Sequence, residues 1–135
     1  MEASPEPSRA VSLAIPAKPD YVVLARLTLS AVCRLSPLAP EEVADLKLAI
    51  TEAATYIMGG ERRQTLRDAE DAERLTFTFD LGDDALQLSV AGSERPSVSD
   101  EERELSLALI RATVDSYEYV DGAVRLVKRL DYSTD

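Results

Sequence analysis

Two hydrophobic periods alternate along this 135-residue chain, and their order limits the folds available to it. A period of two residues is typical of strands, and a period near 3.6 is typical of helices. The expected strands are Ala10–Ile15, Leu75–Leu81, Leu86–Val90, Tyr117–Val120 and Ala123–Leu130, and the expected helices are Tyr21–Leu35, Pro40–Ile57 and Glu101–Ser116. This order predicts an α+β fold, a two-layer sandwich of a mostly antiparallel sheet with helices on one face.

Local signals support these boundaries. Pro40 is followed by two glutamates, and both residue types favour a first helical turn. Gly59-Gly60 is suited to ending that helix, and Asp121-Gly122 is suited to a tight hairpin turn. The helix expected at Glu101–Ser116 carries apolar residues round much of its girth, so we expect it to be covered on more than one side.

Composition limits the chemistry that the chain can perform. It has one cysteine, Cys33, and no histidine, which excludes Ser-His-Asp and Cys-His catalysis, a disulfide framework and the usual zinc or haem sites. Its 25 acidic and 15 basic residues give a formal net charge of -10, which repels nucleic acid and anionic membranes. We therefore expect no nucleic-acid or membrane partner and no bound metal. Because no apolar run approaches the roughly 20 residues that span a bilayer, and because Met1 to Ser8 does not resemble a signal peptide, we also expect a cytoplasmic location.

The length fits one domain, which we place at residues 10–132. Residues 1–9 are acidic and proline-bearing and are expected to form a disordered leader. The charged stretch Glu61–Glu73 is expected to be solvated, and no chemistry is assigned to it.

The first expected helix has a second face that the core does not need. Arg26, Ser30 and Arg34 follow one another at intervals of four residues, on the side away from the apolar stripe. Because a guanidinium group is suited to pairing with a carboxylate on another protein, this row is the candidate partner-binding surface. An ordinary solvated helix face remains the alternative for Arg26.

Four segments together carry a family resemblance. They are Ala25–Val32, Asp45–Ala54, Leu107–Asp115 and Val124–Leu130. In sequence and spacing they resemble the bacterial anti-sigma-factor serine/threonine kinases of the GHKL, or histidine-kinase-like, ATPase superfamily. The resemblance implies a homodimer that sequesters a sigma factor, is opposed by a STAS-domain anti-anti-sigma factor, and phosphorylates that competitor using ATP and Mg²⁺. It also implies that Arg26 lies where the family contacts its sigma factor.

The first nucleotide motif of that family is only half present. The family has Glu-x-x-x-Asn, in which Glu is the general base and Asn helps to hold Mg²⁺, whereas this chain has Glu52 followed by Tyr56. Glu52 is therefore the candidate catalytic residue, or else a vestigial solvated acid. A neutral phenol is a poor ligand for a hard cation, and we expect Tyr56 to pack in the vacated space.

The other two motifs have lost their characteristic residues. Where the family has Asp-x-Gly-x-Gly, the favoured register places Gly92 and Glu94, so the carboxylate that reads adenine is missing. Where the family has a glycine pair beside the phosphates, this chain has Glu104 and Ser106. Side chains there hinder the close backbone approach that glycine allows, and we expect no bound nucleotide cofactor.

The sequence therefore predicts a regulatory protein that binds a sigma factor, a STAS-domain antagonist, or both, as a homodimer and without kinase activity. One alternative is an active ATP-dependent serine kinase that uses Glu52. A second alternative is a structural subunit that dimerises with an active kinase and binds no sigma factor.

Overall fold

The structure is a computed structural model, and it describes residues 10–59, 74–92, 99–120 and 122–131. Its elements are β1 (Ala10–Pro16), η1 (Pro19–Tyr21), α1 (Val22–Cys33), α2 (Pro40–Ile57), β2 (Arg74–Leu81), β3 (Ala85–Ala91), α4 (Asp100–Arg111), β4 (Ser116–Val120) and β5 (Ala123–Arg129). The predicted order of strands and helices is confirmed. The expected leader at residues 1–9 and the charged stretch at 61–73 lie outside the described residues.

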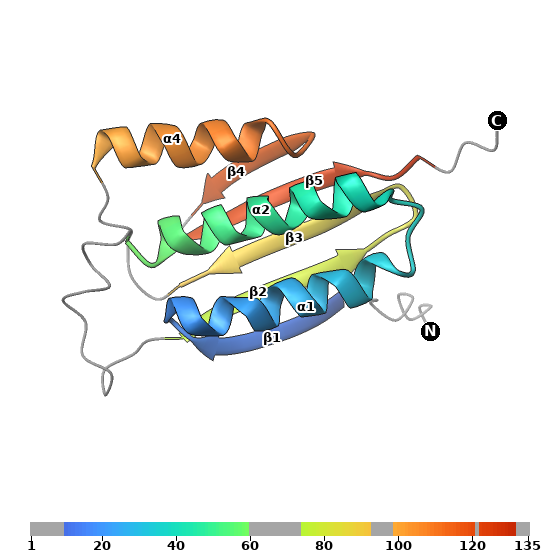
Figure 1. The fold of residues 1–135 in the computed structure, drawn as a ribbon, viewed down its shortest axis with the longest axis horizontal. Coiled ribbons are helices and arrows are strands. Elements are labelled where there is room, and N and C mark those ends of the chain that lie inside the picture. Colours follow the sequence, from blue (N-terminus) through green and yellow to red (C-terminus); the bar gives the residue numbers. More distant parts are fainter. Residues whose placement is uncertain (1–9, 60–73, 93–98, 121, 132–135) are drawn as a thin grey trace, which may run out of the picture.

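The described strands form one sheet in the order β1-β2-β3-β5-β4, with every neighbouring pair antiparallel. β1 and β4 are its edges. Figure 1 shows α1, α2 and α4 side by side on one face of the sheet, with α2 in the middle. The predicted two-layer α+β sandwich is therefore confirmed, and α1 and α4 lie toward opposite edges of it.

The ends of α2 follow from local chemistry. Pro40 opens the helix, and the backbone N–H of Ala39 just before it donates to the carboxylate of Glu42 at 2.9 Å. The same carboxylate lies 3.4 Å from the ammonium group of Lys128, which connects this end of α2 to β5. After the helix, Gly59 has φ = 90°, a conformation that costs glycine little.

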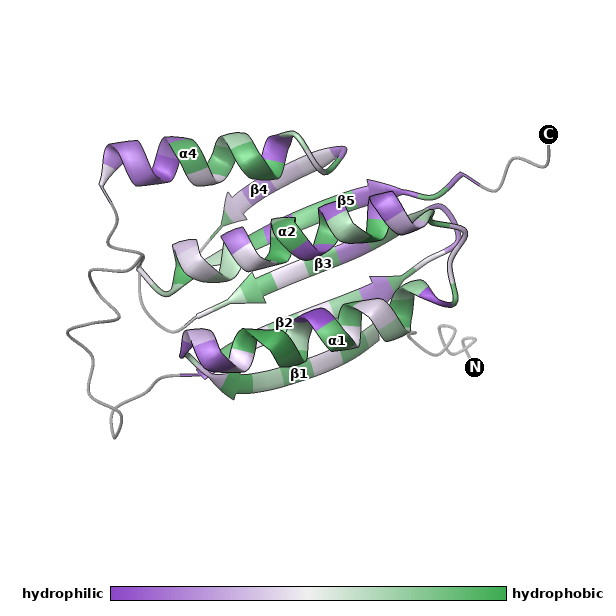
Figure 2. Cartoon of the chain, viewed as in Figure 1, coloured by the Kyte–Doolittle hydropathy of each residue, from purple (hydrophilic) through white to green (hydrophobic). Residues whose placement is uncertain are grey.

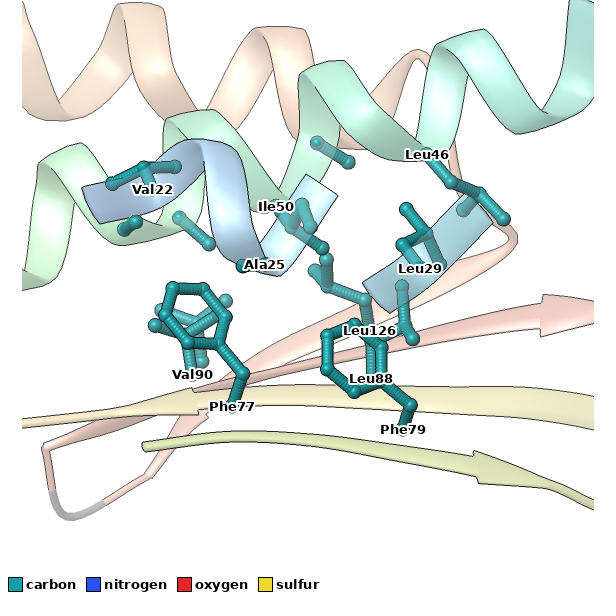
Figure 3. Packing of buried hydrophobic residues seen from close by; sticks show 14 of the residues in the cluster. Val22, Ala25, Leu29, Leu46, Ile50, Phe77, Phe79, Leu88, Val90 and Leu126 are labelled. Carbon is teal, nitrogen blue, oxygen red and sulfur yellow. The ribbon is translucent and has the colours of Figure 1, made fainter. Parts of the chain in front are cut away.

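The sandwich encloses a continuous apolar core. Its largest fully buried side chains are Phe77, Phe79, Ile15, Leu29, Leu46, Ile50, Leu75, Leu86, Ile110, Leu126, Val90 and Val124. Figure 3 shows Phe77 and Phe79 of β2 pointing from the sheet toward α1 and α2. Their rings stack with centroids 6.4 Å apart. Because the inward residues of β2 and β3 alternate with mostly polar or small ones, the opposite face of the sheet is largely polar, and no helix of the described residues covers it.

The third predicted helix ends earlier than the sequence suggests. We expected it to run to Ser116, but α4 ends at Arg111 and Ser116 begins β4. The hydroxyl of Thr113 donates to the carbonyl of Ile110 at 2.9 Å, and the N–H of Asp115 donates to Val127 of β5 at 2.9 Å. Pairing with the sheet thus takes the place of a further helical turn.

The expectation that this helix is covered on more than one side is also wrong. Within α4 the buried residues are Ser106 and Ile110, while Leu105 is 63% exposed. By contrast, α1 buries Val22, Ala25, Leu29, Val32 and Cys33. Figure 2 shows the same contrast, because the first half of α4 is hydrophilic and much of α1 is hydrophobic. α4 lies toward the edge of the layer and packs against α2 and β4, so much of its surface faces solvent.

Candidate functional site

Glu52 and Tyr56 lie one turn apart near the C-terminal end of α2, beside its buried stripe. Ala49 and Ala53, which face the core, are fully buried. Glu52 is half-buried, and Tyr56 is 7% exposed. The burial of Tyr56 favours its interpretation as a packing residue over a surface position.

The carboxylate of Glu52 is engaged by α4. The hydroxyl of Ser106 donates to Oε1 of Glu52 at 3.2 Å. Ser106 is the buried polar residue of the described part of the chain, and a buried hydroxyl needs such a partner. Two residues that the sequence assigned to separate nucleotide motifs are therefore joined directly to each other.

The ring of Tyr56 meets a residue that the sequence analysis did not single out. Tyr119 of β4 lies with its ring centroid 5.6 Å from that of Tyr56, at an interplanar angle of 85°. This edge-to-face arrangement is one that aromatic rings prefer. The alternation of side chains along β4 places both Tyr117 and Tyr119 on the helix side of the sheet. This alternation does not show that Tyr119 contacts a residue of α2.

Tyr117 and Arg111 form a second connection at β4. The guanidinium of Arg111, the last residue of α4, donates to the phenolic oxygen of Tyr117 at 3.1 Å and lies 5.9 Å from its ring centroid. This hydrogen bond raises the pKa of Arg111, which stays protonated. The end of α4 is thus attached to the strand that follows it.

Gly92 follows β3 and lies very close to α2. Its N–H donates to the carbonyl of Gly122 at 3.2 Å. A Cβ atom at Gly92 would lie 2.6 Å from Cγ2 of Ile57, so a larger residue here requires Ile57 to move. Of the remaining motif positions, Glu104 is exposed on α4 and Glu94 lies outside the described residues.

The row Arg26, Ser30 and Arg34 lies off the buried stripe of α1, as predicted, with Ser30 and Arg34 toward α2. Both arginines are exposed, Ser30 is half-buried, and neither arginine forms an ion pair with another described residue. Beside them a parallel row of Val23, Leu27 and Leu35 is exposed, with 62% of Leu27 accessible. The outer side of α1 therefore presents an apolar row next to a cationic one.

Ser30 and Arg34 also line a cavity of about 330 Å³ between α1 and α2. Lys47 of α2 lies on its other side, and the remaining walls come from Cys33, Leu38, Pro40, Val43 and Ala44. Sequence reasoning did not find Lys47, because the spacing within one helix does not show which residue of the next helix faces it. Arg26 does not line this cavity and lies farther toward the start of α1.

Cys33 is buried beside this cavity. Burial raises the pKa of its thiol to about 11, and the positive charge of Lys47 opposes that rise. The thiol is therefore protonated at neutral pH and is a weak nucleophile.

A larger cavity of about 630 Å³ lies on the helix-free face of the sheet. Polar side chains from four strands line it, including Asp80, Gln87, Glu118 and Arg125. Arg125 and Glu118 form an ion pair across β5 and β4 at 3.7 Å. Neither of these two cavities includes Glu52 or Tyr56.

The described residues also bear on metal binding and on membrane spanning. Among them, no cluster of three or more His, Cys, Asp or Glu side chains is placed to hold a metal ion. Nor does any helix in the described ranges have the length and apolarity required to span a membrane.

Comparison with known families supplies the identity of the fold. The histidine kinase-like ATPase domain family matches residues 15–128, which includes every element from α1 to β4 and most of β5. The chain belongs to this family. The resemblance of its sequence segments to the histidine-kinase-like superfamily is confirmed.

Curated relatives of this histidine kinase-like domain include proteins named serine-protein kinase RsbW. The protein from Bacillus pumilus (strain SAFR-032) is 38% identical over 81 residues, which are 60% of this chain and 48% of the relative. The protein from Bacillus cereus (strain ATCC 10987 / NRS 248) is 35% identical over 81 residues, 60% of this chain and 47% of the relative. This chain therefore spans about half the length of the curated relatives it matches.

A solved structure has the same fold. The crystal structure of the RsbU and RsbW domains of Rv1364c from Mycobacterium tuberculosis aligns with a TM-score of 0.67 and 16% identity. The alignment covers 92% of this chain and 33% of the other. At this identity the likeness concerns the fold of the histidine kinase-like domain alone.

Proposed function

We propose that this chain is a regulatory binding protein of a partner-switching system. In this role it sequesters a sigma factor, binds a STAS-domain anti-anti-sigma factor, or does both. The proposal draws on the family membership, on relatives named serine-protein kinase RsbW, and on the resemblance to anti-sigma factors. We further propose that it acts as a homodimer in the cytoplasm.

The proposed role does not include kinase activity. The observation that carries this point is that Glu52 and Tyr56, the two motif positions on α2, are engaged by Ser106 and Tyr119 of this same chain. The phenol of Tyr56 is also a poor substitute for an amide ligand of Mg²⁺. These side chains do not suit a magnesium nucleotide, and we assign no nucleotide cofactor to the protein.

The proposed partner surface is the outer side of α1. Arg26, Ser30 and Arg34 offer charge and hydrogen bonding, and the exposed row containing Leu27 offers apolar contact. The chain carries a net charge of -10, so an acidic segment of a partner is attracted to these arginines more than to the rest of the surface. Lys47 extends the cationic surface across the groove between the helices.

The binding experiment pairs the purified chain with sigma factors and STAS-domain proteins encoded by the same genome. We expect Arg26→Glu to weaken the complex about tenfold or more, because reversing a central interface charge places like charges together. The matched control is Arg103→Glu, which makes the same charge change on an exposed site of α4. Equal affinity for wild type and Arg26→Glu would contradict the proposed surface, and no binding by wild type would contradict the function.

The second candidate, an active serine kinase, is favoured by one observation, the presence of Glu52 at the position of the family's general base. The two candidates separate when the chain is mixed with a STAS-domain protein, Mg²⁺ and labelled ATP. We expect no phosphate transfer above background, and calorimetry should give no nucleotide binding in the micromolar range. Either signal would establish the kinase alternative.

A further inference from the structure

Three contacts join α2, β4 and α4 pairwise, and the proposed partner surface on α1 uses none of them. The contacts are Tyr56–Tyr119, Glu52–Ser106 and Arg111–Tyr117. The first joins α2 to β4, the second joins α2 to α4, and the third joins α4 to β4. We call this set of six residues the α2-β4-α4 triangle.

The triangle matters because α4 has few fully buried apolar residues. In α4, Ile110 is a fully buried large side chain, whereas Leu105 is largely exposed. β4 is a five-residue strand at the edge of the sheet. Both elements therefore depend more on specific side-chain contacts than the central strands do.

Each contact has a geometry that stabilises it. The two tyrosine rings meet edge to face, and the Ser106 hydroxyl donates to the half-buried carboxylate of Glu52 at 3.2 Å, a long hydrogen bond that gives a buried hydroxyl its partner. Because the three contacts close a ring of elements, loosening one of them releases the geometry that the other two require. Contacts in such a connected set are not additive.

The charge of this region opposes a nucleotide. Glu52 is an acidic residue that accepts a hydrogen bond from Ser106, and the first turn of α4 adds Asp100, Glu101 and Glu102. A triphosphate that reached Glu52 between α2 and α4 would have to displace Ser106 from it. The arrangement of these elements is thus stabilised by the chain itself.

We propose that the α2-β4-α4 triangle is a built-in lock, which holds α4 and β4 against the C-terminal half of α2 in one arrangement without any nucleotide. As a consequence, partner binding by this chain is independent of ATP and Mg²⁺. The lock stands on the described contacts alone, whereas this consequence also rests on the proposed function.

Hydrogen exchange measured by mass spectrometry on the full chain tests the lock. Tyr119→Ala removes one side of the triangle, and we expect peptides of α4 to exchange about twofold to tenfold faster while peptides of α1 are unchanged. The matched control is Tyr21→Ala, because Tyr21 is 41% exposed, close to the 39% of Tyr119, and lies outside the triangle. The control should leave α4 unchanged.

A second variant keeps the test sharp if the large-to-small change disturbs folding. Ser106→Ala removes one hydroxyl, and we expect the same acceleration confined to α4 and β4. The double variant Ser106→Ala/Tyr119→Ala should differ from the sum of the two single effects. Unchanged α4 exchange in both single variants, or an acceleration equal in α1 and α4, would overturn the lock.

A further hydrogen-exchange measurement compares wild type with and without about 1 mM Mg-ATP, a concentration at which even a weak nucleotide site is partly occupied. We expect no change in the exchange of α4, and slower exchange would overturn the proposal. Partner affinity measured with and without Mg-ATP should also agree, and an ATP-dependent affinity would contradict the stated consequence. Failure to bind any sigma factor or STAS-domain protein would remove the proposed function but would not alter the exchange result.

Discussion

α1 and α4 are helices of equal length, 12 residues each, that flank α2 toward opposite edges of the same sheet, yet they are held in different ways. α1 buries five residues, all of them apolar or cysteine, whereas α4 buries Ser106 and Ile110. Apolar packing against the core holds α1 in place and leaves its outer side available for binding. Specific contacts with Glu52 and Tyr117 fix α4 from its flanks.

This difference shows how one fold provides both a tolerant recognition surface and a helix held by a few specific contacts. A helix fixed by apolar packing tolerates changes on its outer side, since those residues do not support the fold. That property suits a recognition surface such as the one proposed on α1. A helix held by a few polar and aromatic contacts is destabilised by the loss of any one of them. A single interaction is therefore enough to change how firmly such a helix is held.

The largest expected effect concerns the packing of α1. Leu29 is fully buried, so Leu29→Ala should lower the free energy of unfolding by about 2 to 5 kcal/mol. Leu27→Ala, two residues away but 62% exposed, should change it by less than about 0.5 kcal/mol. Urea unfolding followed by circular dichroism measures both. Similar values for the two variants would contradict the division of α1 into inner and outer sides.

The next effect is a pH dependence at the end of α1. Burial raises the pKa of Cys33 from 9.0 to about 11, so the folded state favours the protonated thiol. The resulting stabilisation is complete below pH 9 and is lost as the pH rises toward 11, by about 2 to 3 kcal/mol in total. Urea unfolding across this range should show the loss in wild type, and Cys33→Ala should lack that part of it. Parallel curves for the two proteins would contradict the prediction.

A smaller effect concerns the start of α4. The N–H of Glu102 donates to the hydroxyl of Ser99 at 3.1 Å, and the carboxylate of Glu102 accepts from the N–H of Ser99 at 3.1 Å. Loss of this cap in Ser99→Ala should cost about 1 kcal/mol, with faster hydrogen exchange in α4 and little change in α1. Ser99→Asp retains a capping oxygen and serves as the control. If Ser99→Ala loosened α1 as much as α4, the two helices would not be held separately.

The smallest effect tests the outer side of α4. Leu105 is 63% exposed, so Leu105→Gln should change the free energy of unfolding by less than about 0.5 kcal/mol. Ile110→Val, in which a fully buried residue loses one methylene, should cost more, about 0.5 to 1.5 kcal/mol. The same urea titrations measure both variants. A larger loss at Leu105 than at Ile110 would indicate that another surface covers α4, as the sequence first suggested.

The sequence was sufficient for the strands, the first two helices and the antiparallel arrangement, because their hydrophobic periods are local and regular. Pro40 and Gly59 mark the ends of α2 through properties of single residues. The end of α4 was predicted wrongly because Ala112 to Asp115 contains no glycine or proline, and Val114 continues an apolar pattern. What ends this helix is pairing of Asp115 with β5, which is a tertiary effect.

The candidate site was predictable only in its parts. The spacing of Glu52 and Tyr56 identified one turn of α2, and the four-residue interval from Arg26 to Arg34 identified one side of α1. Tyr119 and Lys47 were missed because each faces residues of a different element. The periodicity within one helix or strand does not show which residues of another element lie close to it.

The pairing of β1 with β2 also bears on how the chain is made. Ala10 pairs with Asp80 and Pro16 pairs with Arg74, so β1 is synthesised long before β2, the strand with which it pairs. The β2–β3 hairpin, in contrast, closes as soon as it is synthesised. Until β2 arrives, the nascent chain presents β1 as an unpaired segment, and during that interval we expect it to depend most on chaperones.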